Sequence, residues 1–155
     1  MKPITVSVLV ERPRQEVFDH LDVLANHLPF NDHYMTDGEL SGPPTGPGGH
    51  LRFRLRAPGR SEWLDLDTVT SQAPELLVER TVGAGGRRRG RGTYRLEDAG
   101  DGATRVTFEL VTEAAPAYER PLAPLARRWM VRQLERAMQR LAAQVEAAVP
   151  APHAA

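Results

Sequence analysis

The feature that most constrains the fold is a long stretch near the C-terminal end of the chain without a helix breaker. Between Pro124 and Pro150 the sequence holds no further proline and no glycine. This allows a helix of roughly 25 residues, about 38 Å long at about 1.5 Å per residue. One face of the helix collects the apolar side chains: Met130, Val131, Leu134, Ala137, Met138, Leu141, Val145 and Ala148. The opposite side carries arginines at i, i+4 spacing: Arg128, Arg132, Arg136 and Arg140. A helix with this pattern must lie on an apolar partner.

The partner that the sequence supplies is a series of short strands. The first, residues 4–10, alternates apolar and polar side chains, as a half-buried strand does. Segments with similar patterning follow, and turn residues separate them: 36–40, 50–56, 62–70, 76–82, 93–97 and 105–112. The glycine- and arginine-rich stretch 83–92 is predicted to be a long hairpin loop. Strands joined by such turns predict an antiparallel meander of about seven strands.

Two short helices are predicted after the first strand. Val17, Phe18 and Leu21 have helical spacing, and Pro13 suits the first turn of a helix. A second helical piece runs through His27, and Pro29 limits its length. The predicted class is therefore α+β, with residues 1–149 as a single domain and residues 150–155 as a flexible tail.

Composition argues against several classes of protein. The chain of 155 residues has no cysteine, which excludes disulfides and thiolate metal sites. Twenty basic and 20 acidic residues give a formal net charge of zero, which argues against a nucleic-acid partner. The first strand lacks the pattern of a signal peptide, and no apolar run reaches the roughly 18 residues that span a bilayer. We expect a cytoplasmic protein without stable membrane insertion, either a monomer or a weak homodimer.

The order of the predicted elements resembles that of the START-like or helix-grip (SRPBCC) superfamily. The chain is similar to its bacterial branch of polyketide cyclases/dehydrases and lipid-transport proteins. The resemblance rests on stretches spread over nearly the whole chain: the first strand, 13–21, 28–31, the glycine-rich turn before 51–53, 69–78 and 134–141. It implies a curved antiparallel sheet wrapped around the C-terminal helix. It also implies a small hydrophobic ligand between them (a lipid, polyketide, isoprenoid or aromatic ring compound), and it transfers neither a catalytic motif nor a cofactor.

Histidines are the first candidates for chemistry, since imidazole is the usual acid or base near neutral pH. They are scattered, without an i, i+4 pair, so we expect no metal site. His27 and His33 flank the second short helix, which forms the cavity rim in the resembled fold. They are interpreted as rim or surface histidines, with the alternative that His33 and Tyr34 contact ligand at the cavity mouth.

Strand phase supplies the charged candidates. If Leu76, Val78 and Val82 face inward, Arg80 lies on the same face. An inward arginine keeps its charge, so it needs a carboxylate partner or an anionic ligand.

The strand 62–70 would supply that carboxylate. If Val69 faces inward, three more residues of this strand do so: Trp63, Asp65 and Asp67. The alternative is a bulge, which would place Leu64 and Leu66 inside and the charged side chains in water.

The other predicted ligand contacts are apolar or aromatic: Phe53, Tyr94, Phe108, Met130 and Leu134. Arg127 falls on the apolar face of the long helix, where it either extends past the sheet edge to solvent or meets a ligand carboxylate. Together Arg80 and Arg127 suggest an apolar ligand with an acidic or carbonyl group. Trp129 is predicted to point away from the apolar face.

Three functions follow from these candidates. The first is binding of a small hydrophobic ligand. The second is a metal-free cyclase or dehydratase, with Asp65 or Asp67 as general base and Tyr94 or His33 as general acid. The third is a protein-interaction module that uses the arginine row and Trp129. The arginines at 87–91 lack interleaved aromatic residues and are interpreted as a solvated loop.

Overall fold

The computed structural model describes residues 2–148, and the predicted tail at 150–155 lies outside them. Seven strands form one antiparallel sheet: β1 (Ile4–Val10), β2 (Met35–Ser41), β3 (His50–Ala57), β4 (Arg60–Gln72), β5 (Leu76–Gly83), β6 (Arg88–Gly100) and β7 (Ala103–Ala114). The helical elements are α1 (Arg14–Asp22), η1 (Leu24–Asn26), α2 (His27–Asn31), η2 (Ala84–Gly86), η3 (Ala117–Leu122) and α3 (Ala123–Ala147). The strand order is β1-β7-β6-β5-β4-β3-β2, which confirms the predicted class and strand number.

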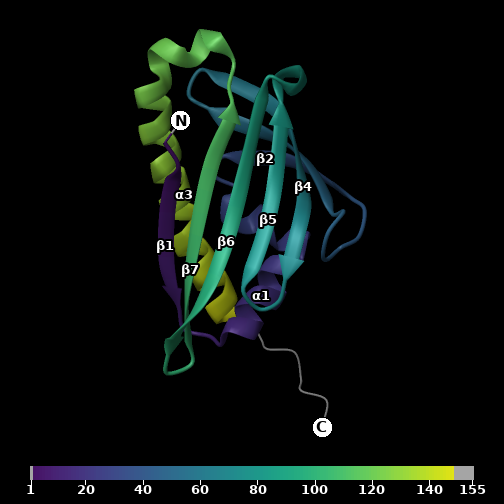
Figure 1. The fold of residues 1–155 in the computed structure, drawn as a ribbon, viewed down its shortest axis with the longest axis vertical. Helices are drawn as coiled ribbons and strands as arrows, with labels where there is room; N and C mark the ends of the chain where they lie inside the picture. The colour runs from purple at the N-terminus through teal and green to yellow at the C-terminus, as the bar shows by residue number, and fades with distance from the viewer. Residues whose placement is uncertain (1, 149–155) are drawn as a thin grey trace.

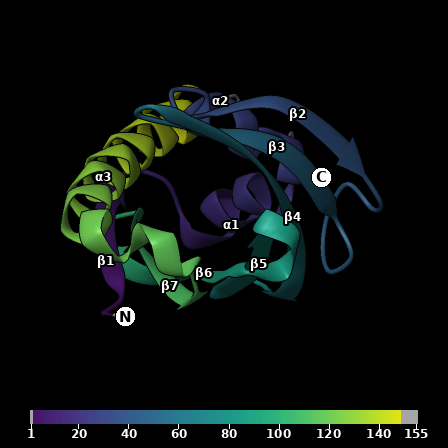
Figure 2. The same ribbon diagram turned by 90° about the horizontal axis from the view of Figure 1, so that it is seen from above.

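The sheet is strongly curved, and the helices lie on its concave side. Seen from above, the strands follow an arc with α1 inside it (Figure 2). α3 packs beside β1 and α2. α1 and η3 lie at opposite ends of the molecule along the strand direction (Figure 1). We therefore refer to the two ends of the molecule as the α1 end and the η3 end.

α3 has the 25 residues that the breaker-free stretch allows. Pro124 sits in its first turn, where a missing amide hydrogen costs nothing. The predicted apolar face is buried against the sheet through Leu134, Met138, Leu141 and Val145. Arg128, Arg132 and Arg136 are exposed on the other side. No helix in residues 2–148 is long and apolar enough to cross a membrane.

The predicted hairpin loop at 83–92 is wrong. β5 continues to Gly83, a single turn follows, and β6 already begins at Arg88. Glycines are poor strand formers, but Gly92 is needed where it stands. A Cβ atom there would lie 2.8 Å from the Phe108 ring. Close packing across the inner face therefore overrides the local preference.

The predicted inward phase of β4 and β5 is also wrong. A bulge between Thr68 and Thr70 shifts the register of β4 against β5. Leu64 and Leu66 are consequently buried, and the bulged Val69 is exposed. The structure thus confirms the alternative of a bulge with Leu64 and Leu66 inside. Five residues that were predicted to face inward lie on the outer face instead: Trp63, Asp65, Asp67, Val78 and Arg80.

Candidate functional site

Glu79 is the acidic side chain that the corrected phase brings to the inner face. Only 7% of it is exposed. Its neighbours across the sheet are Thr68 on β4 and Gly92 on β6. A Cβ atom at Gly92 would lie 3.0 Å from Cγ of Glu79, so the glycine leaves room for the glutamate side chain. A carboxyl group is therefore buried on the inner side of the sheet.

His27 faces Glu79 from the start of α2. Its Nε2 lies 2.7 Å from the carbonyl oxygen of Leu21. Because a carbonyl only accepts hydrogen bonds, Nε2 must carry the proton, and in the neutral ring Nδ1 holds a lone pair. That Nδ1 lies 3.7 Å from Oε2 of Glu79. The unprotonated nitrogen thus points at the carboxyl group across a gap longer than a hydrogen bond.

Burial sets the charge of this pair. Desolvation raises the pKa of Glu79 to about 7 and lowers the pKa of His27 to about 4. Although 3.7 Å is within ion-pair range, both groups prefer their neutral forms, because charges lose more hydration here than they regain from each other. Below about pH 7 the carboxyl group of Glu79 therefore keeps its proton while His27 is neutral, and Glu79 releases that proton as the pH rises through its pKa.

Two tyrosines and an asparagine complete what we call the Glu79 cluster: Glu79, His27, Tyr94, Tyr34 and Asn31. The ring of Tyr94 lies edge-on to His27, with 5.6 Å between centroids. The Tyr34 hydroxyl donates to Oδ1 of Asn31 at 3.0 Å. Burial, with the nearby charge of Glu79, raises the pKa of both tyrosines. Both therefore remain phenols and can donate hydrogen bonds.

The cluster lies where the burial of inward-facing residues changes. Towards the α1 end the core is closed: Val106 and Leu141 have no exposed surface. Towards the η3 end, Thr81, Leu110 and Met130 are only partly buried. Inward-facing side chains at these positions are thus less completely buried from the Glu79 cluster towards η3 than towards α1.

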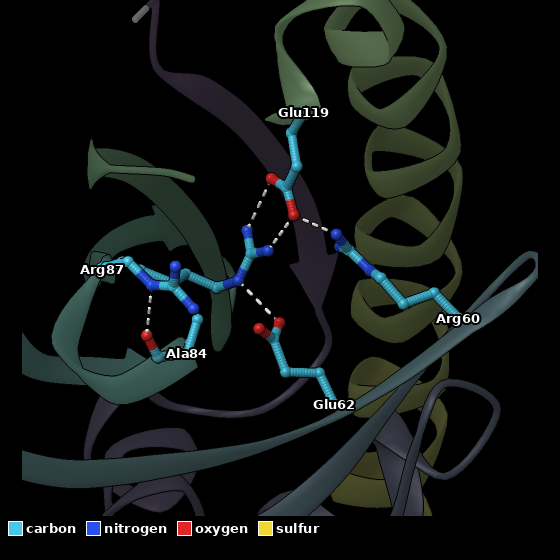
Figure 3. Close-up of polar contacts among 6 residues, drawn as sticks. Arg60, Glu62, Ala84, Arg87 and Glu119 are labelled. Atoms are coloured by element: carbon cyan, nitrogen blue, oxygen red, sulfur yellow. Dashed lines mark hydrogen bonds and ion pairs between the residues drawn. The ribbon is translucent and has the colours of Figure 1, made fainter. Parts of the chain in front are cut away.

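A network of charged residues holds η3 at that end (Figure 3). Glu119 on η3 binds both Arg60, at the start of β4, and Arg88, at the start of β6. Arg88 also donates from Nε to Glu62 at 2.7 Å. Burial alone would raise the pKa of Glu119, but the two arginines lower it overall. We call these four residues the η3 latch, because they tie the segment before α3 to two strands.

The predicted catalytic carboxylates have other partners on the outer face. His50 contacts Asp67 through Nδ1 at 2.8 Å and Asp65 through Nε2 at 3.2 Å. The bond to Asp67, and the charges of both aspartates, raise the pKa of His50. Trp63 lies under two guanidinium groups, with Arg54 4.8 Å from the ring centroid. Neither aspartate pairs with Arg80 among the ion pairs of residues 2–148.

Three other candidates have structural contacts. His33 bonds through Nε2 to the Gln133 carbonyl of α3 at 3.0 Å. Arg127 donates to the carbonyls of Lys2 and Pro3 at 2.6 and 2.8 Å, so it anchors the start of the chain. Trp129 does not point away, since its ring meets that of Tyr34 edge-on, with 6.3 Å between centroids.

The structure does bring several predicted contacts to the inner side. Tyr94 and Phe108 stack with 4.5 Å between centroids, and Phe53 and Leu134 are buried in the same core. Met130 borders this core from α3. Glu79, Asn31 and the inward position of His27 were missed. The spacing of Gly90 and Gly92 was an available signal, since alternate glycines in a strand mark close packing on one face.

Residues 2–148 contain no group of three or more histidine, aspartate or glutamate side chains that could hold a metal ion.

The fold, a curved sheet around a long C-terminal helix, is that of the START-like (SRPBCC) helix-grip proteins. The family described as "Polyketide cyclase / dehydrase and lipid transport" matches residues 1–146, and the chain belongs to this family. No curated protein matches the sequence.

Solved structures agree with the fold. TTHA0849 from Thermus thermophilus is 20% identical with a TM-score of 0.75, over 94% of this chain and 98% of that chain. The Zhui aromatase/cyclase from Streptomyces sp. R1128 is 16% identical with a TM-score of 0.71, over 94% and 93%. Norcoclaurine synthase from Thalictrum flavum is 15% identical with a TM-score of 0.71, over 95% and 87%. At these identities the likeness shows the fold alone.

Proposed function

We propose that this protein binds a small hydrophobic molecule between the inner face of the sheet and α3. The candidates are a lipid, a polyketide, an isoprenoid or an aromatic ring compound. The observation that carries the proposal is the Glu79 cluster, a set of polar and ionisable groups buried between the sheet and the helices. Apolar burial would supply most of the affinity, and the cluster would orient the ligand.

The corrected strand phase changes the expected chemistry of the ligand. Arg80 and Arg127 suggested an acidic ligand, but both contact solvent or backbone on the outside. The charged group that faces inward is Glu79. A ligand carboxylate would be repelled by it above its pKa of about 7. The proposed ligand is therefore neutral and carries a hydroxyl group that donates to Glu79.

Binding of 2-naphthol, measured by calorimetry at pH 8, tests this proposal. The wild-type protein should bind the naphthol and reject 2-naphthoate. Glu79→Gln should weaken naphthol binding by about tenfold or more, because it removes a charged acceptor. Asp67→Asn on the outer face is the matched control and should bind like wild type. Equal affinities for Glu79→Gln and Asp67→Asn would contradict the assignment.

A second candidate function is cyclisation with dehydration, and the pKa of Glu79 near 7 favours it, since a base works best near the operating pH. Glu79 as carboxylate would take a proton from the carbon beside a ligand carbonyl, and Tyr94 would donate a hydrogen bond to the resulting enolate. The enolate carbon would attack a second ligand carbonyl to close the ring, and the resulting alkoxide would take the proton from Glu79 and become a β-hydroxyl group. Removal of the second proton of that carbon by Glu79 would then expel this group as hydroxide, which takes the proton from Glu79 and departs as water. Glu79 thus replaces Asp65 and Asp67 as the proposed base, and Tyr94 remains the proposed acid.

A further inference from the structure

The three most exposed large apolar side chains of residues 2–148 come from one short stretch of the chain, where η3 passes into α3. Tyr118, Leu122 and Leu125 are 64%, 63% and 62% exposed. All three belong to η3 and the first turn of α3. Single exposed apolar residues are ordinary, but a contiguous group marks a binding surface. We call these three residues the η3 corner.

Helix geometry shows that the core cannot absorb this corner. Leu125 precedes the buried Leu134 by nine residues, which at about 100° per residue places the two on opposite sides of α3. Leu122 and Leu125, three residues apart, share the outward side. The apolar stripe of α3 therefore changes sides at its N-terminal end, and Leu122 and Leu125 face solvent.

The charges around the corner are almost all positive. Residues 115–132 contain four arginines, Arg120, Arg127, Arg128 and Arg132, and a single acid, Glu119. Glu119 is held by Arg60 and Arg88 in the η3 latch. Arg120, Arg128 and Arg132 are exposed and form no ion pair among the described residues. The corner thus combines outward apolar side chains with uncompensated positive charge.

From this combination we propose that the η3 corner docks on the surface of an anionic lipid bilayer. Leu122 and Leu125 would insert among the acyl chains, Tyr118 would lie at the headgroup level, and the arginines would contact lipid phosphates. A second copy of this chain fits less well, because a symmetric pair would bring the same arginines face to face. The docking itself does not depend on the proposed function. Docking would place the η3 end of the molecule at the membrane.

Sedimentation with vesicles tests the docking. Wild-type protein should bind phosphatidylcholine vesicles that contain about one third phosphatidylserine, and binding should weaken with salt. Leu122→Ser with Leu125→Ser should weaken it more than tenfold. These side chains are exposed, so the melting temperature should not change. The control pair is Leu9→Ser with Leu40→Ser, also on the surface at 44% and 46% exposure, and it should bind like wild type.

Three results would overturn the proposal. The double variant Leu122→Ser with Leu125→Ser, the corner variant, could bind the vesicles as well as the control pair does. Wild-type protein could also fail to bind them. Size-exclusion chromatography could also show a wild-type dimer that the corner variant loses, with no vesicle binding, and the corner would then be a subunit interface. Binding of 2-naphthol in the corner variant separates this test from the proposed function. It should stay at the wild-type level whether or not vesicles are bound.

Discussion

At the scale of single residues, folding moves one proton from the side chain of His27 to that of Glu79. In the unfolded chain between pH 4.5 and 6.5 the histidine carries a proton and the glutamate does not. In the folded protein the proton is on Glu79 and His27 is neutral. The pair binds one proton in both states, so its contribution to stability does not change with pH in this window.

Single substitutions should reveal the opposite contributions that His27 and Glu79 make to the pH dependence of stability. With Glu79→Gln only His27 remains, and its lowered pKa of about 4 means that the unfolded state binds more protons. Stability relative to wild type should then rise by about 3 kcal/mol from pH 4.5 to 6.5, where the wild-type pair contributes no slope. With His27→Gln only Glu79 remains, and its raised pKa of about 7 means that the folded state binds more protons. Stability relative to wild type should then fall by about 3 kcal/mol over the same window, from pH 4.5 to 6.5.

Urea unfolding of both variants and of wild type across this range measures the two slopes. Subtracting the wild-type curve removes the other titrating groups. If both variants run parallel to wild type, the pair is not buried as described.

At the scale of elements, the start of β6 shows how the same residue type takes different roles. Arg88 and Arg89 are neighbours in an arginine-rich stretch, but Arg88 turns into the η3 latch while Arg89 is exposed. Removing Arg88 leaves Glu62 without its partner and leaves Glu119 with Arg60 alone. A partly buried carboxylate that loses its partner costs more than a surface charge does.

We therefore expect Arg88→Ala to lower the free energy of unfolding by about 2 kcal/mol and Arg89→Ala to change it by less than about 0.5 kcal/mol. Denaturant melts of the two variants make the comparison. Equal effects would mean that the latch does not hold η3.

Elements differ in how much of them the sequence predicts. The apolar stripe of α3 repeats over many turns, so one irregular residue cannot change its assignment. A strand has a period of two, so the bulge at Val69 is enough to reverse the face of every residue before it. Glu79 was missed for a related reason. The outer face of β5 carries Val78 and Val82, and apolar residues on both faces of a central strand hide its orientation.

At the scale of the whole molecule, the sheet and helices share one core, in which Val106 and Leu141 are fully buried at the α1 end and Thr81, Leu110 and Met130 are partly buried towards the η3 end. The inner polar groups were not predictable from local patterns, because Glu79, His27 and Tyr94 come from three elements that only the curvature of the sheet brings together. The order of the elements, by contrast, was sufficient to predict the fold.

The central claim is that a small apolar molecule occupies the inner space beside Glu79, and native mass spectrometry of the purified protein tests it most directly. The wild-type protein should carry a bound molecule of low mass. Thr81→Phe, which fills the accessible side next to the cluster, should carry much less while remaining folded. A wild-type protein that is empty as purified, and stays empty after exposure to lipid and aromatic compounds, would contradict the account.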